Sequence, residues 1–568
     1  MRVKIAHFTL AFLFILLGLG LFNLGVLQSR RFCNLSDKNC IRLLPQPGAR
    51  GIIFDRNNKV IVDNYLTYDV MLLSQDNKDL EKTFSTVARI LETSPEELKS
   101  AFKNGYSAAF MPVAIAKNID IKKAIILEEV KMDLPGIIIQ ARPVRYYPYG
   151  KLASHAIGYL NEIDHWRLTK LANYGYKTKD IVGYTGVEEK YDYYLRQEEG
   201  ALSLEVDHRG RVTRVLGFKP PQSGKDIRLT LDLKIQKIVE DALGDRIGSV
   251  IIMEPATGEI IALASSPGFN PAVFVKKSIS AINNLFNHPD SLLLNRAIQG
   301  VYPPASVFKL VVATAALETN KIRPGTTFTC SGSLRIGRRQ FRCWDTHGTQ
   351  DLIGGIAHSC DVFFYHTGLL LGPQLIHDYA LKFGFHKPTG VDLPYESVGF
   401  VPDPLWKKLY RLQGWFDGDT ANLTIGQGDL LVTPLQVVRM TAAFANGGFL
   451  VNPYIVKAID GRDISLQQRR FARLNLKDKT LDYIRQGLRK TVTDGTANVL
   501  SGLRVSLAGK TGTSQVPLGQ PHAWFTGFFP FKNPQFIICV FLEHGGSGYY
   551  ACVLTKQIIE AMAKEGLI

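Results

Sequence analysis

A run of twenty residues near the N-terminus, Phe8 to Leu27, contains no charged side chain. An α-helix needs about 20 predominantly apolar residues to cross a bilayer. A cleaved signal peptide would have a shorter apolar region and a small-x-small site, whereas Gln-Ser-Arg-Arg follows Leu27. We therefore predict that residues 1–29 form a short cytoplasmic tail and a retained single-pass membrane anchor. Basic residues flank both ends of the run, so charge alone leaves the orientation open.

The remaining chain is long enough for more than one domain, because single hydrophobic cores rarely exceed about 250 to 300 residues. A cluster of Pro, Gly and polar residues, "PPQSGKD" at 220–226, reads as a linker. We therefore predict a mixed α+β module over 30–225 and a second domain over 226–568. The net charge of +16 indicates an anionic partner. Because the basic residues are dispersed and form no zinc-finger, RNP or basic-zipper pattern, we do not expect nucleic acid to be that partner.

The second domain has strand patterns at both of its ends and helical patterns between them. "GSVIIME" and "EIIALASS" flank a Gly-containing turn and predict a hairpin. "HAWFTGFFP" and "QFIICVFLEH" predict two more strands, followed by a helix over 550–564. This order favours an α+β fold in which one antiparallel sheet is covered by helices.

Ser306 and Lys309 lie at the start of a predicted helix in the segment "GVYPPASVFK". Pro303 and Pro304 suit a helix entry, so the helix is expected to begin near Ala305. Residues at i and i+3 share a face, so the lysine amine can reach the serine hydroxyl, which needs a base to become a nucleophile. The S-x-x-K spacing alone is weak evidence, because it also occurs in ordinary first turns of helices.

Two further elements follow in order, Ser359-Cys360-Asp361 and Lys510-Thr511-Gly512-Thr513. The order S-x-x-K, S-D-N type and K-T-G is typical of penicillin-binding proteins and class A β-lactamases. "GKTGT" does not read as a phosphate loop, because the glycine expected four residues upstream is absent. In a strand, Gly512 would let a substrate backbone approach closely.

On these motifs and on "RGIIFDRN", "GYTGVEEKYDYYL", "IGQGDLLVTPLQ" and "EHGGSG", the chain resembles class B penicillin-binding proteins over nearly its whole length. It is most similar to the elongation type, penicillin-binding protein 2. The resemblance implies that 30–225 is a pedestal domain of the dimerisation type and that 226–568 is a penicillin-binding transpeptidase domain. It implies a peptidoglycan D,D-transpeptidase that cross-links stem peptides during cell elongation, is acylated by β-lactams and has a D,D-carboxypeptidase side activity.

The resemblance also implies roles for single residues. Ser306 is the expected nucleophile, Lys309 the base for acylation, and Ser359 and Lys510 the proton relays. The expected substrate-binding residues are Asp361, Thr511, Gly512 and Thr513, with the two threonines on the donor carboxylate. Asp361 stands where many relatives have Asn, and a carboxylate near Lys309 would favour the protonated amine.

Three other functions remain open on the sequence: a division-type penicillin-binding protein 3, a β-lactam hydrolase or sensor, and a catalytically idle cell-wall scaffold. For the main hypothesis, the resemblance implies a RodA-type glycan polymerase and other elongation-complex proteins as partners. Because stem peptides lie outside the cytoplasmic membrane, the part of the chain after the anchor is expected there too.

Three of the seven cysteines and one histidine lie close together in the sequence: Cys330, Cys343, His347 and Cys360. Three thiolates and one imidazole suit a tetrahedral structural zinc site, and some elongation-type relatives resemble this chain in binding zinc beside the active site. Asp345 is an alternative ligand, and buried thiols or one disulfide are alternatives to a metal. Cys539 and Cys552 are expected in the core, and Cys33 and Cys40 are candidates for a disulfide.

Overall fold

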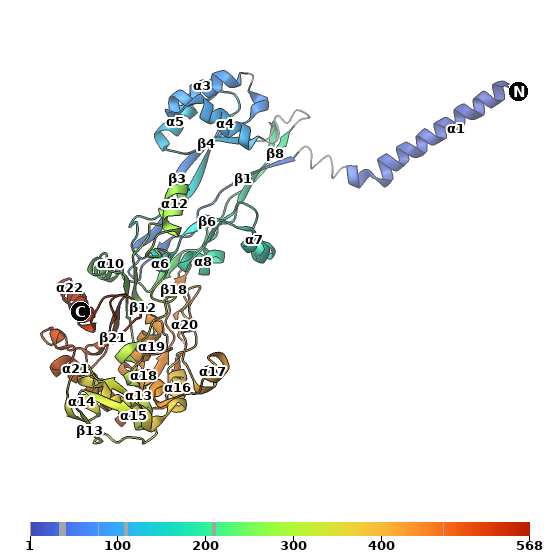
Figure 1. Cartoon of the computed structure of the whole chain (residues 1–568). Helices are drawn as coiled ribbons and strands as arrows, with labels where there is room; N and C mark the ends of the chain where they lie inside the picture. The colour runs from blue at the N-terminus through green and yellow to red at the C-terminus, as the bar shows by residue number, and fades with distance from the viewer. Residues whose placement is uncertain (1, 33–40, 78, 107–111, 207–211, 470) are drawn as a thin grey trace. The chain divides into compact units, whose positions relative to one another are not determined.

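A computed structural model describes residues 2–32, 41–77, 79–106, 112–206, 212–469 and 471–568 (Figure 1). The chain folds into two compact units. Unit 1 comprises residues 1–51, 64–145 and 196–224, and unit 2 comprises residues 52–63, 146–195 and 225–568. Cys33 and Cys40, the candidate disulfide pair, lie outside the described residues.

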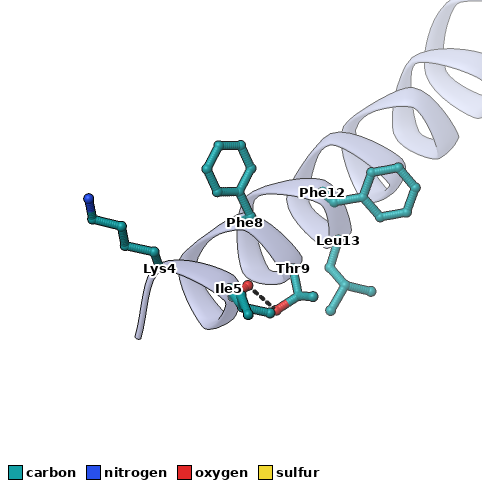
Figure 2. A pocket seen from close by; sticks show the side chains of 6 residues that line it. All are labelled: Lys4, Ile5, Phe8, Thr9, Phe12 and Leu13. Atoms are coloured by element: carbon teal, nitrogen blue, oxygen red, sulfur yellow. Dashed lines mark hydrogen bonds between the residues drawn. The ribbon is translucent and has the colours of Figure 1, made fainter. Parts of the chain in front are cut away.

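The predicted anchor is a helix, α1 (Arg2–Phe22), which continues as a π-helical turn over Asn23–Leu27. In the described part of the chain, Arg2–Leu27 is the one helix long and apolar enough to cross a membrane. Figure 2 shows Phe8 and Phe12 standing out from its first turns, and the Thr9 hydroxyl donates to the Ile5 carbonyl at 3.0 Å. Because that bond satisfies the hydroxyl within the helix, the surface of α1 suits a lipid environment.

Unit 1 is a mixed α+β structure, as predicted. Strand β8 (Gly200–Val206) pairs antiparallel with both β1 (Ile41–Gln46) and β9 (Val212–Lys219). Its other main elements are β3 (Val60–Leu72), α3 (Leu80–Leu91), α4 (Pro95–Gly105), β4 (Val113–Ile119), α5 (Ile121–Glu129) and β5 (Ile137–Tyr146). The Ser94 hydroxyl caps α4 by accepting from the Glu97 N–H at 3.2 Å, so the predicted helix start is confirmed.

Two segments of the predicted 30–225 module, 52–63 and 146–195, belong to unit 2. Strand β2 (Ile53–Phe54) runs parallel to β10 (Ile227–Leu229). From the second segment, Tyr191 Oη donates to the buried carboxylate of Asp392 at 2.8 Å. Because these contacts join residues far apart in sequence, neither compact unit is one continuous segment, and the domain boundary at 225/226 stays a prediction.

One five-stranded antiparallel sheet, in the order β12-β11-β23-β22-β21, forms the centre of unit 2. Its strands are β11 (Gly248–Met253), β12 (Ile260–Ser266), β21 (Ala508–Ser514), β22 (His522–Phe529) and β23 (Phe536–Leu542). Helices α10 (Leu233–Leu243) and α22 (Gly548–Lys564) pack on one face, and α19 (Pro434–Ala445) packs on the other. This architecture confirms the predicted sheet, and Cys539 and Cys552 are buried in its core as expected.

The three motifs meet at one edge of this sheet. Strand β21, which carries the K-T-G element, is the edge strand. The 3₁₀ turn Ala305–Val307 packs against it and leads into α13 (Lys309–Glu318). Helix α15 (Asp361–Leu371), which follows α14 (Leu352–Ala357), packs against α13 and brings the Ser359 element to the same place.

Candidate active site

Ser306 lies in the 3₁₀ turn immediately before α13. The preceding residue, Ala305, has a left-handed backbone with φ of 50°, which a residue bearing a Cβ rarely adopts. The Ala305 N–H donates to Gly426 O at 2.9 Å. A Cβ on Gly426 would lie 2.1 Å from Ala305 O, so only glycine permits this contact. Gly426 therefore stabilises the turn that contains Ser306.

Lys309 is completely buried, and its amine is held by the Ser359 element. Lys309 Nζ donates to Ser359 O at 2.8 Å, to Ser359 Oγ at 3.2 Å and to Asp361 Oδ1 at 2.6 Å. The sequence predicted that the amine would reach Ser306, but among the described residues its bonds go to Ser359 and Asp361. The carboxylate explains this preference, because a charge-assisted bond is roughly twice as strong as a neutral one.

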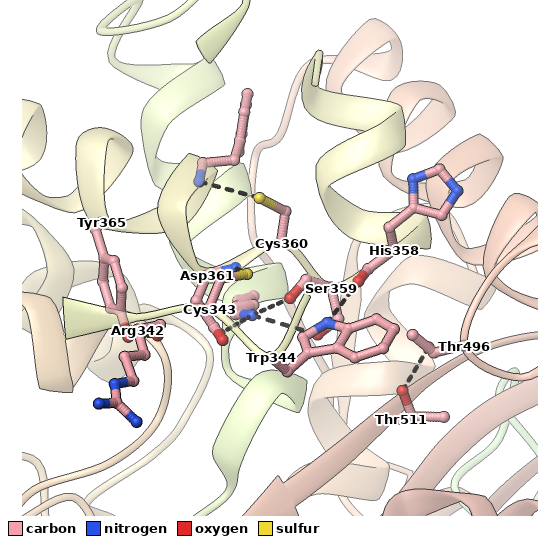
Figure 3. Close-up of polar contacts among 12 residues, drawn as sticks. Arg342, Cys343, Trp344, His358, Ser359, Cys360, Asp361, Tyr365, Thr496 and Thr511 are labelled. Carbon is pink, nitrogen blue, oxygen red and sulfur yellow. Dashed lines mark hydrogen bonds and ion pairs between the residues drawn. The ribbon is translucent and has the colours of Figure 1, made fainter. Parts of the chain in front are cut away.

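The Ser359 loop is held in place from two sides. Ser359 has a left-handed backbone with φ of 55°. On one side, Cys360 caps α15, its Sγ accepting from the Phe363 N–H at 3.4 Å. On the other, Trp344 Nε1 donates to His358 O at 3.0 Å (Figure 3). These contacts fix the serine that bonds the Lys309 amine.

Lys510 supplies a second buried amine from β21. Its Nζ donates to Thr511 O at 3.1 Å. Burial, with repulsion from Lys309 as a further cause, holds the pKa of Lys510 well below its usual value. A Cβ on Gly512 would lie 3.2 Å from Pro304 O, so the glycine lets β21 approach the nucleophile turn closely. The site thus contains one lysine paired with a carboxylate and one whose charged form is disfavoured.

The hydroxyls of Thr511 and Thr513 are both positioned by neighbours. Thr511 Oγ1 shares a hydrogen bond with Thr496 Oγ1 at 2.6 Å (Figure 3). Thr513 Oγ1 accepts from the Gly548 N–H, at the start of α22, at 2.9 Å. Because Thr513 accepts in this contact, its own proton stays available for an anion.

Sequence reasoning gave no role to several residues that hold the site. Gly426 and Gly548 lie in motifs that served only to identify the family resemblance. Trp524, whose Nε1 donates to Pro303 O at 3.1 Å, lies in a segment that predicted only a strand. Thr496 lies in no motif that the sequence singled out. Each acts on a residue distant in the chain, so no local pattern points to its partner.

The four predicted metal ligands lie together beside this loop. The ligand atoms of Cys330, Cys343, His347 and Cys360 are all within 4.8 Å of one another. His347 Nδ1 is 3.7 Å from Cys330 Sγ and 3.5 Å from Cys343 Sγ. The three thiols are not in disulfides. The backbone carbonyl of Asp345, the alternative ligand, accepts a hydrogen bond from Cys330 Sγ at 3.5 Å. The Asp345 carboxylate is not one of the clustered ligand atoms.

The geometry of this group fits a zinc ion. Zn–S and Zn–N bonds of about 2.3 and 2.0 Å place neighbouring ligand atoms of a tetrahedron about 3.6 Å apart. The two sulfur–nitrogen separations agree with that value. A hydrogen bond with Cys360, helped by backbone N–H groups, lowers the pKa of Cys343 to about 3. The same hydrogen bond, with burial, raises the pKa of Cys360, so Cys343 is the thiol of this pair that ionises first.

Both units contain sequences matched by known families. Residues 248–564 match the penicillin binding protein transpeptidase domain, and residues 45–229 match the penicillin-binding protein dimerisation domain. The peptidoglycan D,D-transpeptidase MrdA of Acinetobacter baumannii is 33% identical, with 96% of this chain and 87% of that protein covered.

Two solved structures resemble the whole fold. PBP2 of Helicobacter pylori, solved in a complex with MreC, has a TM-score of 0.82 at 29% identity, and the match covers 93% of this chain and 99% of that one. A chain of a peptidoglycan synthase complex that coordinates polymerization and crosslinking has a TM-score of 0.75 at 29% identity, covering 99% of this chain and 98% of that one.

Proposed function

This chain belongs to the class B penicillin-binding proteins and is a peptidoglycan D,D-transpeptidase of the elongation type, and we propose that Ser306 carries its acyl-enzyme. The MrdA and PBP2 relatives favour this type over the division type. Ser306 Oγ attacks the carbonyl between the two terminal D-alanines of a donor stem peptide and expels D-alanine. The acyl group then passes to an amine of a neighbouring stem. This proposal rests on one observation: the Ser306 turn, Lys309 and Lys510 meet at the edge strand β21.

Proton transfer during acylation is assigned to the groups around Lys309. Neutral Lys309 is assigned to accept the Ser306 proton, and Asp361 Oδ1, 2.6 Å from Lys309 Nζ, would stabilise the ammonium that forms. Ser359 Oγ, 3.2 Å from the same amine, can then pass a proton to the leaving D-alanine nitrogen. Lys510 adds an amine whose lowered pKa favours its neutral form.

Substrate binding is assigned to β21. The Thr511 and Thr513 hydroxyls would hold the terminal carboxylate of the donor, and the N–H groups of Ser306 and Thr513 would form the oxyanion hole. The Gly548 N–H supports this role, because it leaves the Thr513 proton free to donate. Gly512 leaves room for the peptide backbone beside the strand.

Covalent labelling tests the acyl-enzyme directly. We expect intact-mass measurement of the full chain after reaction with a fluorescent penicillin to show one adduct per chain. Peptide mapping should place it on the peptide that contains Ser306. An adduct on any other peptide, or no adduct, would contradict the assignment.

We also propose that Cys330, Cys343, His347 and Cys360 hold one structural zinc ion. The ion would bind the Cys-rich segment to the start of α15, and Cys360 lies between Ser359 and Asp361 in sequence. Bound zinc would supply structural cross-linking at this place, since all four protein ligands of a structural site are present. The chain itself then positions Ser359 for proton transfer.

Metal analysis of the purified chain should find about one zinc per chain. Cys343→Ser is expected to lower both the zinc content and the rate of penicillin acylation, because the Ser359 loop loses its support. Cys539→Ala, which removes a thiol buried in the sheet, is the matched control and should retain zinc. A zinc-free wild-type chain would refute the site, and full acylation after chelation would refute its positioning role.

We propose that residues 30–568 lie outside the cytoplasmic membrane and stay attached through α1. The exposed apolar surface of α1 and the location of stem peptides support this arrangement. Protease added to spheroplasts that express the chain should digest this region. Protection from the protease, or a mature N-terminus after Leu27, would contradict the proposal.

We propose a RodA-type glycan polymerase as a partner, because the matched families supply cross-linking and dimerisation domains. The structural neighbour from a complex that coordinates polymerization and crosslinking, and the neighbour solved with MreC, support assembly with other elongation proteins. Co-purification of the full chain with such a polymerase from detergent-solubilised membranes tests the pairing.

A further inference from the structure

A small β-hairpin beside the active site carries four arginines within eight residues. Strands β14 (Ser333–Ile336) and β15 (Arg339–Arg342) pair antiparallel. The side chains of Arg335, Arg338, Arg339 and Arg342 are exposed, and none forms a hydrogen bond or ion pair with another described residue. Such a concentration of one charge attracts an anionic partner.

The packing of the hairpin separates its two faces. Leu334 and Phe341, which lie opposite each other, pack against the core of unit 2. Arg342 lies opposite Ser333, and Arg335 lies opposite Gln340, on the other face. Arg339, opposite Ile336, shares the face of Leu334 and Phe341 by register, but it lies next to the turn and is exposed. Arg335 and Arg342 are therefore diagonal neighbours, with Cβ atoms within about 8 Å of each other. The outer face of the two strands is therefore polar and cationic.

The hairpin connects directly to the Ser359 loop. Cys343 follows β15, and its Sγ accepts from the Asp361 N–H at 3.2 Å. Trp344 comes next, and its side chain is fixed by the bond to His358 O although the residue is 60% exposed. Figure 3 shows Arg342 and Thr511 on opposite sides of Ser359. In that view, Arg342 at the end of the hairpin lies across Ser359 from Thr511, a residue of the proposed donor site on β21.

We propose that Arg335, Arg338, Arg339, Arg342 and Trp344 bind the acceptor strand through the carboxylates of its stem peptide. This inference rests on the proposed function, which places the donor at Thr511 and Thr513 and leaves the opposite side of Ser359 to the acceptor. Every uncross-linked stem peptide ends in a carboxylate. The planar guanidinium group matches a carboxylate with two parallel hydrogen bonds, and a fixed indole adds contact area at little entropic cost.

The test measures binding of the full chain in detergent to uncross-linked glycan strands that carry stem peptides. The variant R335Q/R338Q/R339Q removes three charges and leaves Arg342, which precedes Cys343, in place. Its Kd is expected to rise about tenfold, since each surface ion pair contributes little alone. The variant R504Q/K532Q/K564Q removes the same charge from exposed sites elsewhere in unit 2 and should bind within about twofold of wild type. Thermal unfolding midpoints close to that of the wild-type chain would show that both variants fold.

Three further measurements identify the ligand. Strands whose peptides an amidase has removed should bind the wild-type chain about tenfold more weakly, and added salt should weaken binding to intact strands. The wild-type chain in nanodiscs of anionic lipid should bind strands with the same affinity as the chain in nanodiscs of neutral lipid. If anionic lipid competes with strands for the wild-type chain but not for the triple arginine variant, the surface binds lipid and the proposal is wrong.

The proposal also fails if the wild-type chain does not bind strands, if the hairpin variant keeps the wild-type Kd, or if the control variant loses as much affinity. Penicillin labelling of the wild-type chain reports on Ser306 separately. A labelled Ser306 with unaltered strand binding in the hairpin variant refutes the acceptor surface alone, whereas absence of labelling refutes the proposed function.

Discussion

Ser306→Ala is expected to abolish covalent labelling by penicillin while the chain stays folded. The substitution removes the attacking oxygen, and no other serine lies in the turn against β21. Among the described residues, the Ser306 side chain makes no hydrogen bond that the fold would lose. A fluorescent-penicillin gel and intact-mass measurement should detect no adduct, and the thermal unfolding midpoint should remain close to that of wild type.

Ser501→Ala is a suitable control for this experiment, because Ser501 is exposed and lies outside the three motifs. It should be labelled at the wild-type rate. A covalent adduct on folded Ser306→Ala protein would move the nucleophile to another residue and contradict the mechanism.

Lys309→Ala is expected to slow acylation by about 10² to 10⁴, the range that general-base assistance contributes. Removing the amine also leaves the Asp361 carboxylate without its 2.6 Å partner. Repulsion from Lys309 helps to lower the pKa of Lys510, so its loss should raise that pKa. If Lys510 then acts as the remaining base, the residual acylation rate of the variant should rise with pH as Lys510 loses its proton.

Stopped-flow measurement of penicillin acylation across pH tests both effects. Lys309→Met, which fills more of the buried space than alanine, separates the chemical effect from a packing defect. Lys321→Ala changes an exposed lysine shortly after α13 and should acylate normally. Rates within tenfold of wild type for both Lys309 variants would show that another group takes the Ser306 proton.

The sequence predicted the features that depend on neighbouring residues. Apolar runs indicated strands β11, β12, β22 and β23 of the central sheet, and a polar cap followed by proline indicated the start of α4, because backbone preference and capping act within a few residues. The spacing of Cys330, Cys343, His347 and Cys360 predicted a set of ligands, and the structure brings their donor atoms within 4.8 Å of one another.

The hydrogen-bond partners of the catalytic side chains could not be predicted from neighbouring residues. Nothing local linked Lys309 to Ser359 and Asp361, which lie 50 and 52 residues further along the chain. Likewise, the close approach of Gly426 to Ala305 requires two loops to meet, and a glycine in a loop has many roles. Helix periodicity predicted Ser306 as a neighbour of Lys309, but the Lys309 amine bonds the Asp361 carboxylate, which the packing of α15 on α13 brings within 2.6 Å.

The sequence by itself thus determined the apolar N-terminal helix, the order of the three motifs, the class of sheet and the identity of the chemical groups, since each rests on composition or short spacing. Tertiary structure alone decided which segments of the N-terminal module pack with the catalytic sheet, which groups hold the Lys309 amine and which side of the arginine hairpin faces solvent. Those features come from strand pairing and helix packing between distant residues, and the free energy of such contacts depends on the whole fold.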